Sequence, residues 1–420
     1  MADTFISLIR MAAAGARGEA VQEETVNWQE LISLANEHGV LPLVAWAVKH
    51  SPQLKCSNEI REFFESIIIN AGMSNMIRRQ RILYLINELQ KEGIEVKLLK
   101  GYAIAQYYAH PDSREAVDTD LWVNETQEKQ MYNFLQKKAF EVYPRSFTSH
   151  HGICQHKKYG KIEVHTRLYD EIVEDVWFSG IKKSEYVLEP FIKIQVDDGE
   201  FTTLGHTDQA IFLTLHMVKH FIESGLSIRM MLDISLYLQC NHHCIDFKRF
   251  YGIMERMHYA KLVNCIFSLM IQYGGFSEET FACIMKQQPH LAELLLRDMY
   301  QGGYMGRKEM DERHIGSMTY NRMLFRKDNT QIAYVVKMVW WKARSGVKRM
   351  FPTLYRMQKM YPVLKKLPLL APFAWLFHAG TFLKEKIVSG ILKKEIQGSN
   401  GLCNETVNKR IRLFRELDML

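Results

Sequence analysis

Two aspartates stand two residues apart in a segment whose pattern alternates. Asp118 and Asp120 lie in the run from Val117 to Val123, in which polar and apolar residues alternate. Such alternation predicts a β-strand, and residues two apart on a strand point to the same side. Two carboxylates held side by side repel each other, so folding alone gives no reason for the pair. A divalent metal does, because proteins bind Mg2+ through one or two carboxylates together with substrate phosphates.

A third carboxylate comes from a second alternating segment. Glu163 lies in the run from Lys161 to Thr166, which also predicts a strand. Upstream, an apolar segment ends in Lys100 and Gly101, which is typical of a strand that turns into a helix. The predicted elements follow one another along the chain as a strand, a glycine, a helix, the Asp-x-Asp strand and a second acidic strand. That order suits a metal-dependent phosphoryl-transfer site, in which metal ions stabilise the attacking and leaving oxygens.

Several basic side chains near these acids are candidates for contacts to phosphate or substrate. Lys100 offers a point charge and Arg114 a bidentate fork; surface charges at turn positions are the alternative for both. His165 and Arg167 share the strand face of Glu163, so we predict that they orient that acid or contact the substrate. For His165 the alternative is an ordinary hydrogen-bonded core histidine.

The same segments carry a resemblance to a known family. They are Leu98 to Gly101, Arg114, Asp118 to Asp120, and Ile162 to Leu168, joined by Trp28 to Pro42 upstream and by His216, Lys219, His220, Arg229 and Asp233 downstream. In this order they resemble a bacterial nucleotidyltransferase family, a branch of the polymerase-beta-like nucleotidyltransferase superfamily. The resemblance covers about Trp28 to Asp246.

That resemblance implies a function. Asp118 and Asp120 would bind Mg2+, in a site of two ions, with Glu163 as the third acid, and Gly101 would let the backbone approach the triphosphate. The reaction would move a nucleoside monophosphate from an NTP to a hydroxyl-type acceptor, which is a small molecule, a sugar or a protein. Tyr102 departs from the superfamily, which usually has Gly or Ser after this glycine. A non-catalytic nucleotide-binding or scaffold protein that keeps the fold is therefore the alternative.

Three further motifs have simpler explanations. His216 and His220 are four apart on one predicted helix face, which suits a metal, but a structural role beside the nucleotide site is favoured. Arg229 and Asp233 have the spacing of a helix ion pair. The crowded segment from Cys240 to Cys244 is interpreted as a loop, because structural zinc sites draw ligands from two separated pairs.

The patterns around the acidic strands predict a small mixed α+β unit embedded in a mainly helical protein, and the resemblance implies that this unit is a nucleotidyltransferase core of the polymerase-beta-like type, a small mixed sheet with helices. We expect a helical region over 1–92, the nucleotidyltransferase core over 93–205 and a helical domain over 206–305. A basic, aromatic and proline-broken helical region would occupy 306–420.

The N-terminal region shows the clearest helix signals. Asn27 is the predicted N-cap of a helix, with Glu30 as its capping-box partner. Two helices are expected at Ser57 to Ile69 and Met73 to Lys91, the second with an apolar face. The alanine-rich segment from Met1 to Gly18 is expected to be a frayed amphipathic helix rather than a secretory signal.

Composition and charge limit the class of protein. The 420 residues include 7 cysteines, an odd number without framework spacing, which together with the missing signal predicts a reducing cytoplasm. No apolar run approaches the roughly 20 residues that span a bilayer, so no transmembrane segment is expected.

The net charge of +7 is concentrated near the C-terminus. Residues 329–384 contain ten basic and no acidic residues, which leaves −3 for the rest of the chain. Tryptophans, tyrosines and phenylalanines accompany these lysines and arginines, a combination that suits an anionic membrane surface or single-stranded nucleic acid. A packed helical domain with a solvated basic face is the favoured interpretation of this segment. Contact with an anionic membrane surface comes next.

Overall fold

The computed structural model describes residues 2–22, 26–116, 118–144, 151–166, 188–196, 199–223, 225–281, 289–302, 354–392 and 409–419. The chain forms two compact units: Met1–Arg313 together with Leu413–Met419, and His314–Arg412 with Leu420. Each unit is described by itself. The finer division into four regions stays a prediction.

A five-stranded mixed sheet is the centre of the first unit. Its order is β1-β2-β5-β4-β3, where the strands are β1 (Val96–Leu98), β2 (Asp118–Val123), β5 (Gly160–His165), β4 (His151–His156) and β3 (Glu141–Tyr143). β2 and β5 run parallel, whereas the other neighbours are antiparallel. A separate hairpin consists of β6 (Ile192–Val196) and β7 (Gly199–Thr203). The strands predicted to carry the acids therefore exist and lie side by side.

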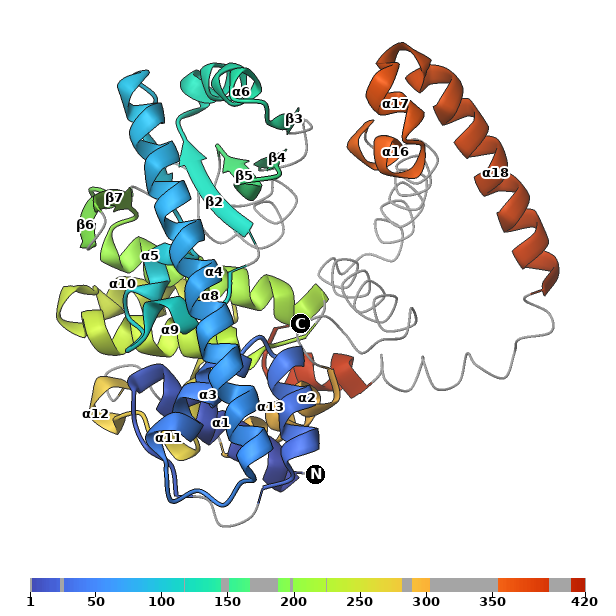
Figure 1. Cartoon of the computed structure of the whole chain (residues 1–420). Helices are drawn as coiled ribbons and strands as arrows, with labels where there is room; N and C mark the ends of the chain where they lie inside the picture. Colours follow the sequence, from blue (N-terminus) through green and yellow to red (C-terminus); the bar gives the residue numbers. More distant parts are fainter. Residues whose placement is uncertain are drawn as a thin grey trace. The chain divides into compact units, whose positions relative to one another are not determined.

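The two faces of the sheet differ in character. One face is apolar and packs against α4 (Asn58–Lys91) and α6 (Glu128–Lys137), the helices beside the strands in Figure 1. This core contains Leu121 and Val123 of β2 and Ile162 and Val164 of β5. Because side chains alternate along a strand, the residues between these point to the opposite face, and those are the acids.

The helix α4 corrects one prediction. The sequence suggested two helices separated near Gly72, but a single helix of 34 residues runs through this position. Ser57 caps its start by accepting a hydrogen bond from the Ile60 amide. A glycine inside a helix costs only about 1 kcal/mol relative to alanine, and propagation of an existing helix is cooperative. The predicted apolar face, which includes Ile82, Ile86 and Leu89, is buried in the core.

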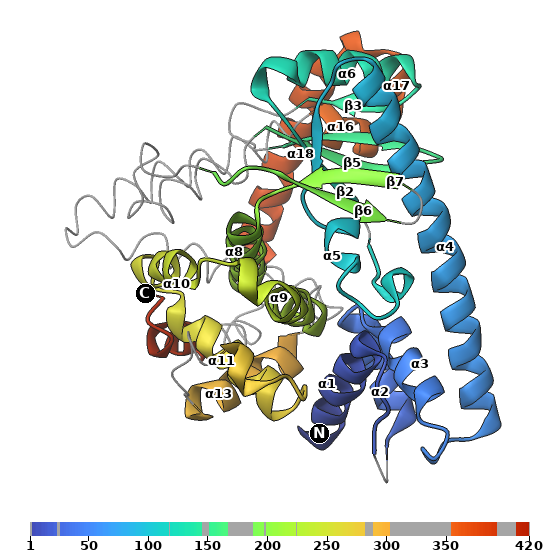
Figure 2. The ribbon, with the colours of Figure 1, turned by 90° about the vertical axis from the view of Figure 1, so that its left-hand side faces the viewer.

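The N-terminal helices form a packed layer at one end of α4 (Figure 2). They are α1 (Ala2–Arg17), α2 (Trp28–Glu37) and α3 (Leu41–His50). Asn27 is the N-cap of α2 and accepts a hydrogen bond from the Glu30 amide, as predicted. The expectation of a frayed α1 is wrong. Leu8 and Ile9 are fully buried, and a Cβ at Gly15 would lie only 1.8 Å from the Leu43 carbonyl oxygen. The alanines and Gly15 thus allow α1 to pack closely on α3.

Helices follow the strands in the first unit. They are α8 (His206–Glu223), α9 (Ile228–Asn241), α10 (Phe247–Arg256), α11 (Ala260–Gln272), α12 (Glu278–Phe281) and α13 (Pro289–Gly302). The helices α8 and α9 lie between the strands and the N-terminal layer, whereas α11 and α13 lie beside that layer (Figure 2). Asp246 caps α10 by accepting a hydrogen bond from the Arg249 amide. Near the C-terminus, Phe414 packs edge-on against Phe221 of α8.

The second unit contains α16 (Leu354–Met360), α17 (Val363–Lys366), a short 3-10 turn at Pro368–Leu370 and α18 (Ala371–Leu392). Met357, Leu364 and Ala371 form a small core. In the part of the chain that the structure describes, none of the helices has the length and apolar character needed to cross a membrane.

A buried histidine makes stability depend on pH. Burial lowers the pKa of His38 from its ordinary 6.5 to about 4, and its Nδ1 accepts a hydrogen bond from the Ile228 amide. Only the unfolded chain takes up this proton between those two values. We therefore expect the free energy of unfolding to fall as the pH drops from about 6.5 to about 4, by about 3 kcal/mol for this residue.

Urea unfolding at a series of pH values tests this expectation. His38→Gln, whose amide oxygen can accept the same hydrogen bond, should lose about 3 kcal/mol less between pH 6.5 and 4 than the wild type does. His290→Gln removes an exposed histidine and should leave the slope unchanged. An unchanged slope in His38→Gln would contradict the assignment.

Candidate functional site

The acids are brought together by the register of two parallel strands. Asp118 pairs with Lys161 and Asp120 pairs with Glu163 across β2 and β5. Paired residues of neighbouring strands point to the same face. Asp118, Asp120, Lys161 and Glu163 therefore share the face opposite the apolar core, as the sequence predicted for the acids.

The three carboxylates converge closely enough to share a cation. One oxygen each from Asp118, Asp120 and Glu163 lies within 4.8 Å of the others. Oxygens that share an Mg2+ ion at about 2.1 Å lie roughly 3 to 4 Å apart in an octahedron. Asp120 is almost fully buried, whereas the Asp118 side chain is 31% exposed. The residues present thus fit a hard divalent ion that is anchored in the protein and open to substrate on one side.

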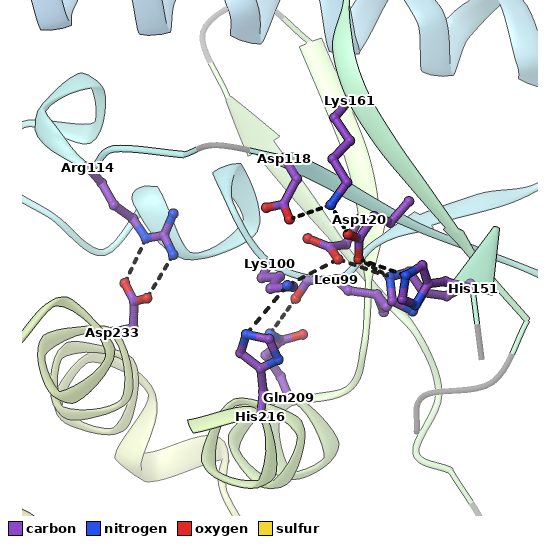
Figure 3. A network of polar contacts seen from close by, with 12 residues as sticks. Leu99, Lys100, Arg114, Asp118, Asp120, His151, Lys161, Gln209, His216 and Asp233 are labelled. Atoms are coloured by element: carbon purple, nitrogen blue, oxygen red, sulfur yellow. Dashed lines mark hydrogen bonds and ion pairs between the residues drawn. The ribbon is translucent and has the colours of Figure 1, made fainter. Parts of the chain in front are cut away.

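Two lysines balance the charge of these acids. Lys100 Nζ lies 3.1 Å from Asp120 Oδ1, and Lys161 Nζ lies 3.7 Å from Asp118 Oδ2 and donates a hydrogen bond to Glu163 (Figure 3). Burial works to lower the pKa of Lys100, but the carboxylates of Asp120 and Asp118 outweigh it and raise the pKa. Lys100 is therefore a firmly charged cation inside the site. Sequence analysis missed Lys161, although its position two residues before Glu163 on the same strand was a usable signal.

His165 links two of the acids. Its Nε2 lies 2.9 Å from Asp120 Oδ1 and 3.6 Å from Glu163 Oε2. Burial opposes protonation, but the hydrogen bonds to Asp120 and Glu163 outweigh it and raise the pKa of His165. Burial likewise works to raise the pKa of Asp120, yet the charges of Lys100 and His165 lower it. The imidazolium thus donates to an ionised Asp120 and holds it in place.

His151 is a second histidine at this site, and the sequence analysis did not single it out. It begins β4, directly opposite His165 in the antiparallel register, and its Nε2 lies 3.7 Å from Glu163 Oε2. Burial works to raise the pKa of Glu163, but the hydrogen bond from His165 and the charge of His151 hold it below its ordinary value. The proximity of His151 to Glu163 depends on the register between β4 and β5, which the sequence pattern did not specify.

The turn after β1 positions Lys100 and Gly101. Gly101 has a φ of +65°, a conformation that favours glycine, and precedes the short helix α5 (Tyr102–Ala105). Thr203 donates a hydrogen bond to the Leu98 carbonyl and Gln209 donates one to the Leu99 carbonyl, so β7 and α8 hold this turn.

Tyr102 points away from the acids. Its ring is buried in the apolar core, its hydroxyl donates a hydrogen bond to the Asn75 carbonyl of α4, and burial raises its pKa to about 12. A tyrosine after the glycine therefore does not place its bulk in the carboxylate cluster.

Arg114 contacts the helical part of the unit. Its Nε and Nη2 each lie 2.7 Å from the Asp233 carboxylate, and the Tyr108 hydroxyl donates a further bond to Asp233 Oδ1. Figure 3 shows this pair to one side of the carboxylate cluster. The spacing of Arg229 and Asp233 suggested a helix pair; instead Asp233 holds Arg114, and Arg229 donates to the Glu115 carbonyl. A nucleotide contact by Arg114 stays a prediction, and Arg167 lies outside the described residues.

The two histidines of α8 approach the site as neutral rings. His216 Nε2 lies 3.5 Å from Lys100 Nζ, and the ring centroids of His216 and His220 are 4.6 Å apart. Burial, followed by the charge of Lys100, lowers the pKa of His216 well below its usual range and that of His220 to about 3. His216 can therefore accept a hydrogen bond from Lys100, which supports the predicted structural role beside the site.

Metal clusters among the described residues occur at the sheet. Asp118, Asp120 and Glu163 form one, and His151, Glu163 and His165 form another. Cys240 and Cys244 belong to neither and are exposed at the end of α9, where His242–Cys244 form a short 3-10 turn. The interpretation of this segment as a loop agrees with that geometry.

Two solved structures are similar to part of this chain. The lincosamide antibiotic adenylyltransferase LnuA in its lincomycin-bound form is 14% identical, with 37% of this chain and 93% of that chain covered and a TM-score of 0.27. An antigenic nucleotidyltransferase-like protein from Paracoccidioides brasiliensis is 13% identical, with 39% and 76% covered and a TM-score of 0.27. No curated protein matches the chain.

A family model gives the decisive match. The model described as "Uncharacterised nucleotidyltransferase" matches residues 24–273, which is more than half of the chain and includes Lys100, the acids, His216 and Asp233. The predicted fold class, an α+β nucleotidyltransferase core within a mainly helical protein, is confirmed. The chain therefore belongs to this family of uncharacterised nucleotidyltransferases.

Proposed function

We propose that this protein is an Mg2+-dependent nucleotidyltransferase that moves a nucleoside monophosphate from an NTP to a hydroxyl-type acceptor. The observation that supports the proposal best is the convergence of Asp118, Asp120 and Glu163 on one face of the sheet, within 4.8 Å of one another. The acceptor belongs to the class of small molecules, sugars or proteins that offer a hydroxyl group. We place the reaction in the cytoplasm.

Asp118, Asp120 and Glu163 would hold two Mg2+ ions. When bound, such ions neutralise charge on the phosphates and stabilise the attacking and leaving oxygens. Lys100 and Lys161, which already lie among the acids, would pair with phosphate oxygens once the metal ions take over the carboxylates. Phosphoryl transfer asks the protein mainly for position and charge, and this cluster offers both.

Neighbouring residues would position this machinery. His165 holds Asp120 through a hydrogen bond, which fixes the carboxylate in one orientation. Gly101 would leave the backbone room to approach the triphosphate. We propose that Arg114 and Arg167 contact the nucleotide. Arg114 would also anchor the turn before β2 through its ion pair with Asp233.

The alternative is a nucleotide-binding or scaffold protein without catalysis. This alternative was suggested by Tyr102, a bulky residue that follows Gly101 where the superfamily usually has Gly or Ser. Because that ring packs in the core and bonds to Asn75, it does not narrow the site. The arrangement of the acids and lysines therefore favours the catalytic proposal.

Calorimetric titration of each NTP, with and without Mg2+, tests the proposed site. The wild type should bind at least one NTP in an Mg2+-dependent manner, and the Asp118→Asn/Asp120→Asn variant should lose this binding. Glu95→Gln is the matched control, because Glu95 stands just before β1 with its side chain 80% exposed. Equal binding in wild type and double variant, or none in either, would refute the site. Binding without pyrophosphate release across a broad acceptor screen would favour the scaffold alternative.

We also propose that the second unit contacts an anionic membrane surface. Large apolar side chains are exposed on one short stretch: Leu367, Leu369, Phe373, Leu376 and Phe377, with Leu369 91% and Phe373 70% exposed. This stretch belongs to residues 329–384, which carry ten basic and no acidic residues. Residues 329–353 lie outside the described part of the chain. Apolar residues beside positive charge suit the boundary between headgroups and acyl chains of an anionic bilayer.

Co-sedimentation with vesicles tests this membrane contact. The wild type should sediment with phosphatidylcholine vesicles that contain phosphatidylserine, and less with pure phosphatidylcholine, because about 1 kcal/mol is gained for each basic residue near an anionic surface. Phe373→Asp/Phe377→Asp should lose most of this binding. Ile69→Asp is the control, since Ile69 is an exposed apolar residue of α4. Unchanged binding in the double variant would rule the contact out.

A further inference from the structure

Two histidines and a glutamate gather beside the proposed Mg2+ site. His151 of β4 and His165 of β5 face each other in the antiparallel register, and their ring centroids are 5.1 Å apart. The Nε2 atoms of both lie near the same oxygen, Glu163 Oε2, at 3.7 and 3.6 Å. Three ligand atoms from two adjacent strands thus point to one place, held by a sheet rather than by a loop.

The donor set differs in kind from the carboxylate cluster. Mg2+ is bound by oxygen ligands, whereas imidazole nitrogen suits Zn2+ and its first-row neighbours. Two histidines and one glutamate with an open fourth position is a known arrangement for Zn2+. The His151–Glu163–His165 cluster therefore selects a transition metal by its chemistry.

The spacing also suits a tetrahedral ion. Ligand atoms about 2.0–2.1 Å from Zn2+ lie roughly 3.3–3.4 Å apart in a tetrahedron. The two nitrogen–oxygen distances are only a few tenths of an ångström longer. All three ligand atoms lie within 4.8 Å of one another, so side-chain adjustment would be needed to bring them to bonding distance.

The charged neighbours allow such an ion. Lys161, which donates a hydrogen bond to Glu163, has a side chain that is 37% exposed, so its ammonium group can turn to solvent. His165 would exchange its hydrogen bond to Asp120 for a bond to the metal, and Lys100 would remain as a partner of Asp120.

We propose that His151, Glu163 and His165 form a second metal site, which binds Zn2+ or a similar transition-metal ion. Glu163 belongs to this site and to the proposed Mg2+ site, and His165, which holds Asp120, would turn to the bound ion, so Zn2+ would weaken the binding of Mg2+. Zn2+ would therefore inhibit nucleotidyl transfer by competition for Glu163. This regulatory part rests on the proposed function, whereas the binding of Zn2+ itself does not.

Direct binding of Zn2+ to the full chain is the first test. Wild type should bind one Zn2+ in competition with a chromophoric chelator, and His151→Ala should bind it about a hundredfold more weakly, because one of three ligands is lost. His151→Gln serves as a second variant that keeps the size of the side chain. X-ray absorption of the Zn2+-loaded wild type should show two imidazole ligands. Failure of the wild type to bind Zn2+, or wild-type affinity for Zn2+ in both His151 variants, would overturn the proposal.

Asp118→Asn separates the two sites. It lies outside the histidine cluster, so it should keep wild-type Zn2+ affinity while losing Mg2+-dependent NTP binding. In the wild type, Zn2+ should weaken Mg2+-dependent NTP binding, and in His151→Ala it should not. If the wild type shows no Mg2+-dependent NTP binding but binds Zn2+ as expected, the proposed function fails and the Zn2+ site stands. If Asp118→Asn loses Zn2+ as well, the two sites are one and the inference is wrong.

Discussion

Replacing Asp118 with Cys is expected to reduce Mg2+-supported nucleotidyl transfer about a thousandfold, equivalent to about 4 kcal/mol of transition-state stabilisation. Mg2+ is a hard ion that a thiolate binds poorly, whereas softer ions accept sulfur. Replacing Mg2+ with Mn2+ or Cd2+ should therefore restore part of the activity of Asp118→Cys but none of the activity of Asp118→Asn. Pyrophosphate release from each NTP, with a panel of hydroxyl compounds as acceptors, measures the effect.

Asp118 is a suitable position for this test because its side chain is partly exposed. It contributes no buried apolar surface, and Lys161, whose Nζ lies 3.7 Å from its carboxylate, is also partly exposed. A loss of activity in Asp118→Cys would therefore not come from unfolding, which a thermal melt can check. Glu95→Gln should behave as wild type with every metal. Full activity of Asp118→Asn with Mg2+, or the same metal preference in Asp118→Cys and wild type, would show that Asp118 does not bind the metal.

Replacing Asp233 with Ala is expected to lower the free energy of unfolding by about 3–5 kcal/mol, because it leaves the buried guanidinium of Arg114 without its carboxylate. The pair is bidentate, both side chains are less than 10% exposed, and Tyr108 adds a third hydrogen bond. This interaction joins α9 to the turn before β2, so its loss should also destabilise the five-stranded sheet that contains β2. Urea unfolding measures the change.

Glu293→Ala is the matched control, because it removes a carboxylate from an exposed helical pair with Arg297 and should leave stability unchanged. Combining Asp233→Ala with Arg114→Met should recover part of the loss, since the double variant no longer buries a lone charge. If Asp233→Ala is as stable as the wild type, the pair is not the anchor that its geometry indicates.

The same variants test the predicted nucleotide contact of Arg114. If Arg114 acts only through Asp233, Arg114→Met and Asp233→Ala should weaken Mg2+-dependent NTP binding to a similar extent. A loss in Arg114→Met alone would instead point to direct contact with the nucleotide.

Local pattern was enough to place the acids. Alternation over 117–123 and 161–166 predicted two strands, with Asp118 and Asp120 on one side of the first and Glu163 on the second, and both strands are present. Their parallel pairing places Glu163 beside Asp120. The cap at Asn27 and the apolar face of α4 follow from equally local rules. These features depend on residues close in the chain, where side-chain direction and hydrogen bonding are set by backbone geometry alone.

Features that join distant parts of the chain needed the tertiary structure. Lys161 between Asp118 and Glu163, His151 opposite His165, and Asp233 on Arg114 are partners set by strand register and helix packing. Sequence analysis also missed the short strands β3, β6 and β7. Each has too few residues to show a clear alternating pattern, and its pairing depends on the neighbouring strand.

Two helices show why burial cannot be inferred from composition. The alanine-rich α1 was expected to fray, but its small side chains and Gly15 allow close contact with Leu43 of α3, 28 residues further along the chain. Two helices were predicted where α4 runs, but packing of one face against the sheet accompanies a single continuous helix. Local sequence patterns thus identified the acids that we propose for the chemistry and the strands that hold them. The partners and pKa values of these acids came from the packing, because they depend on which distant residues lie within a few ångströms.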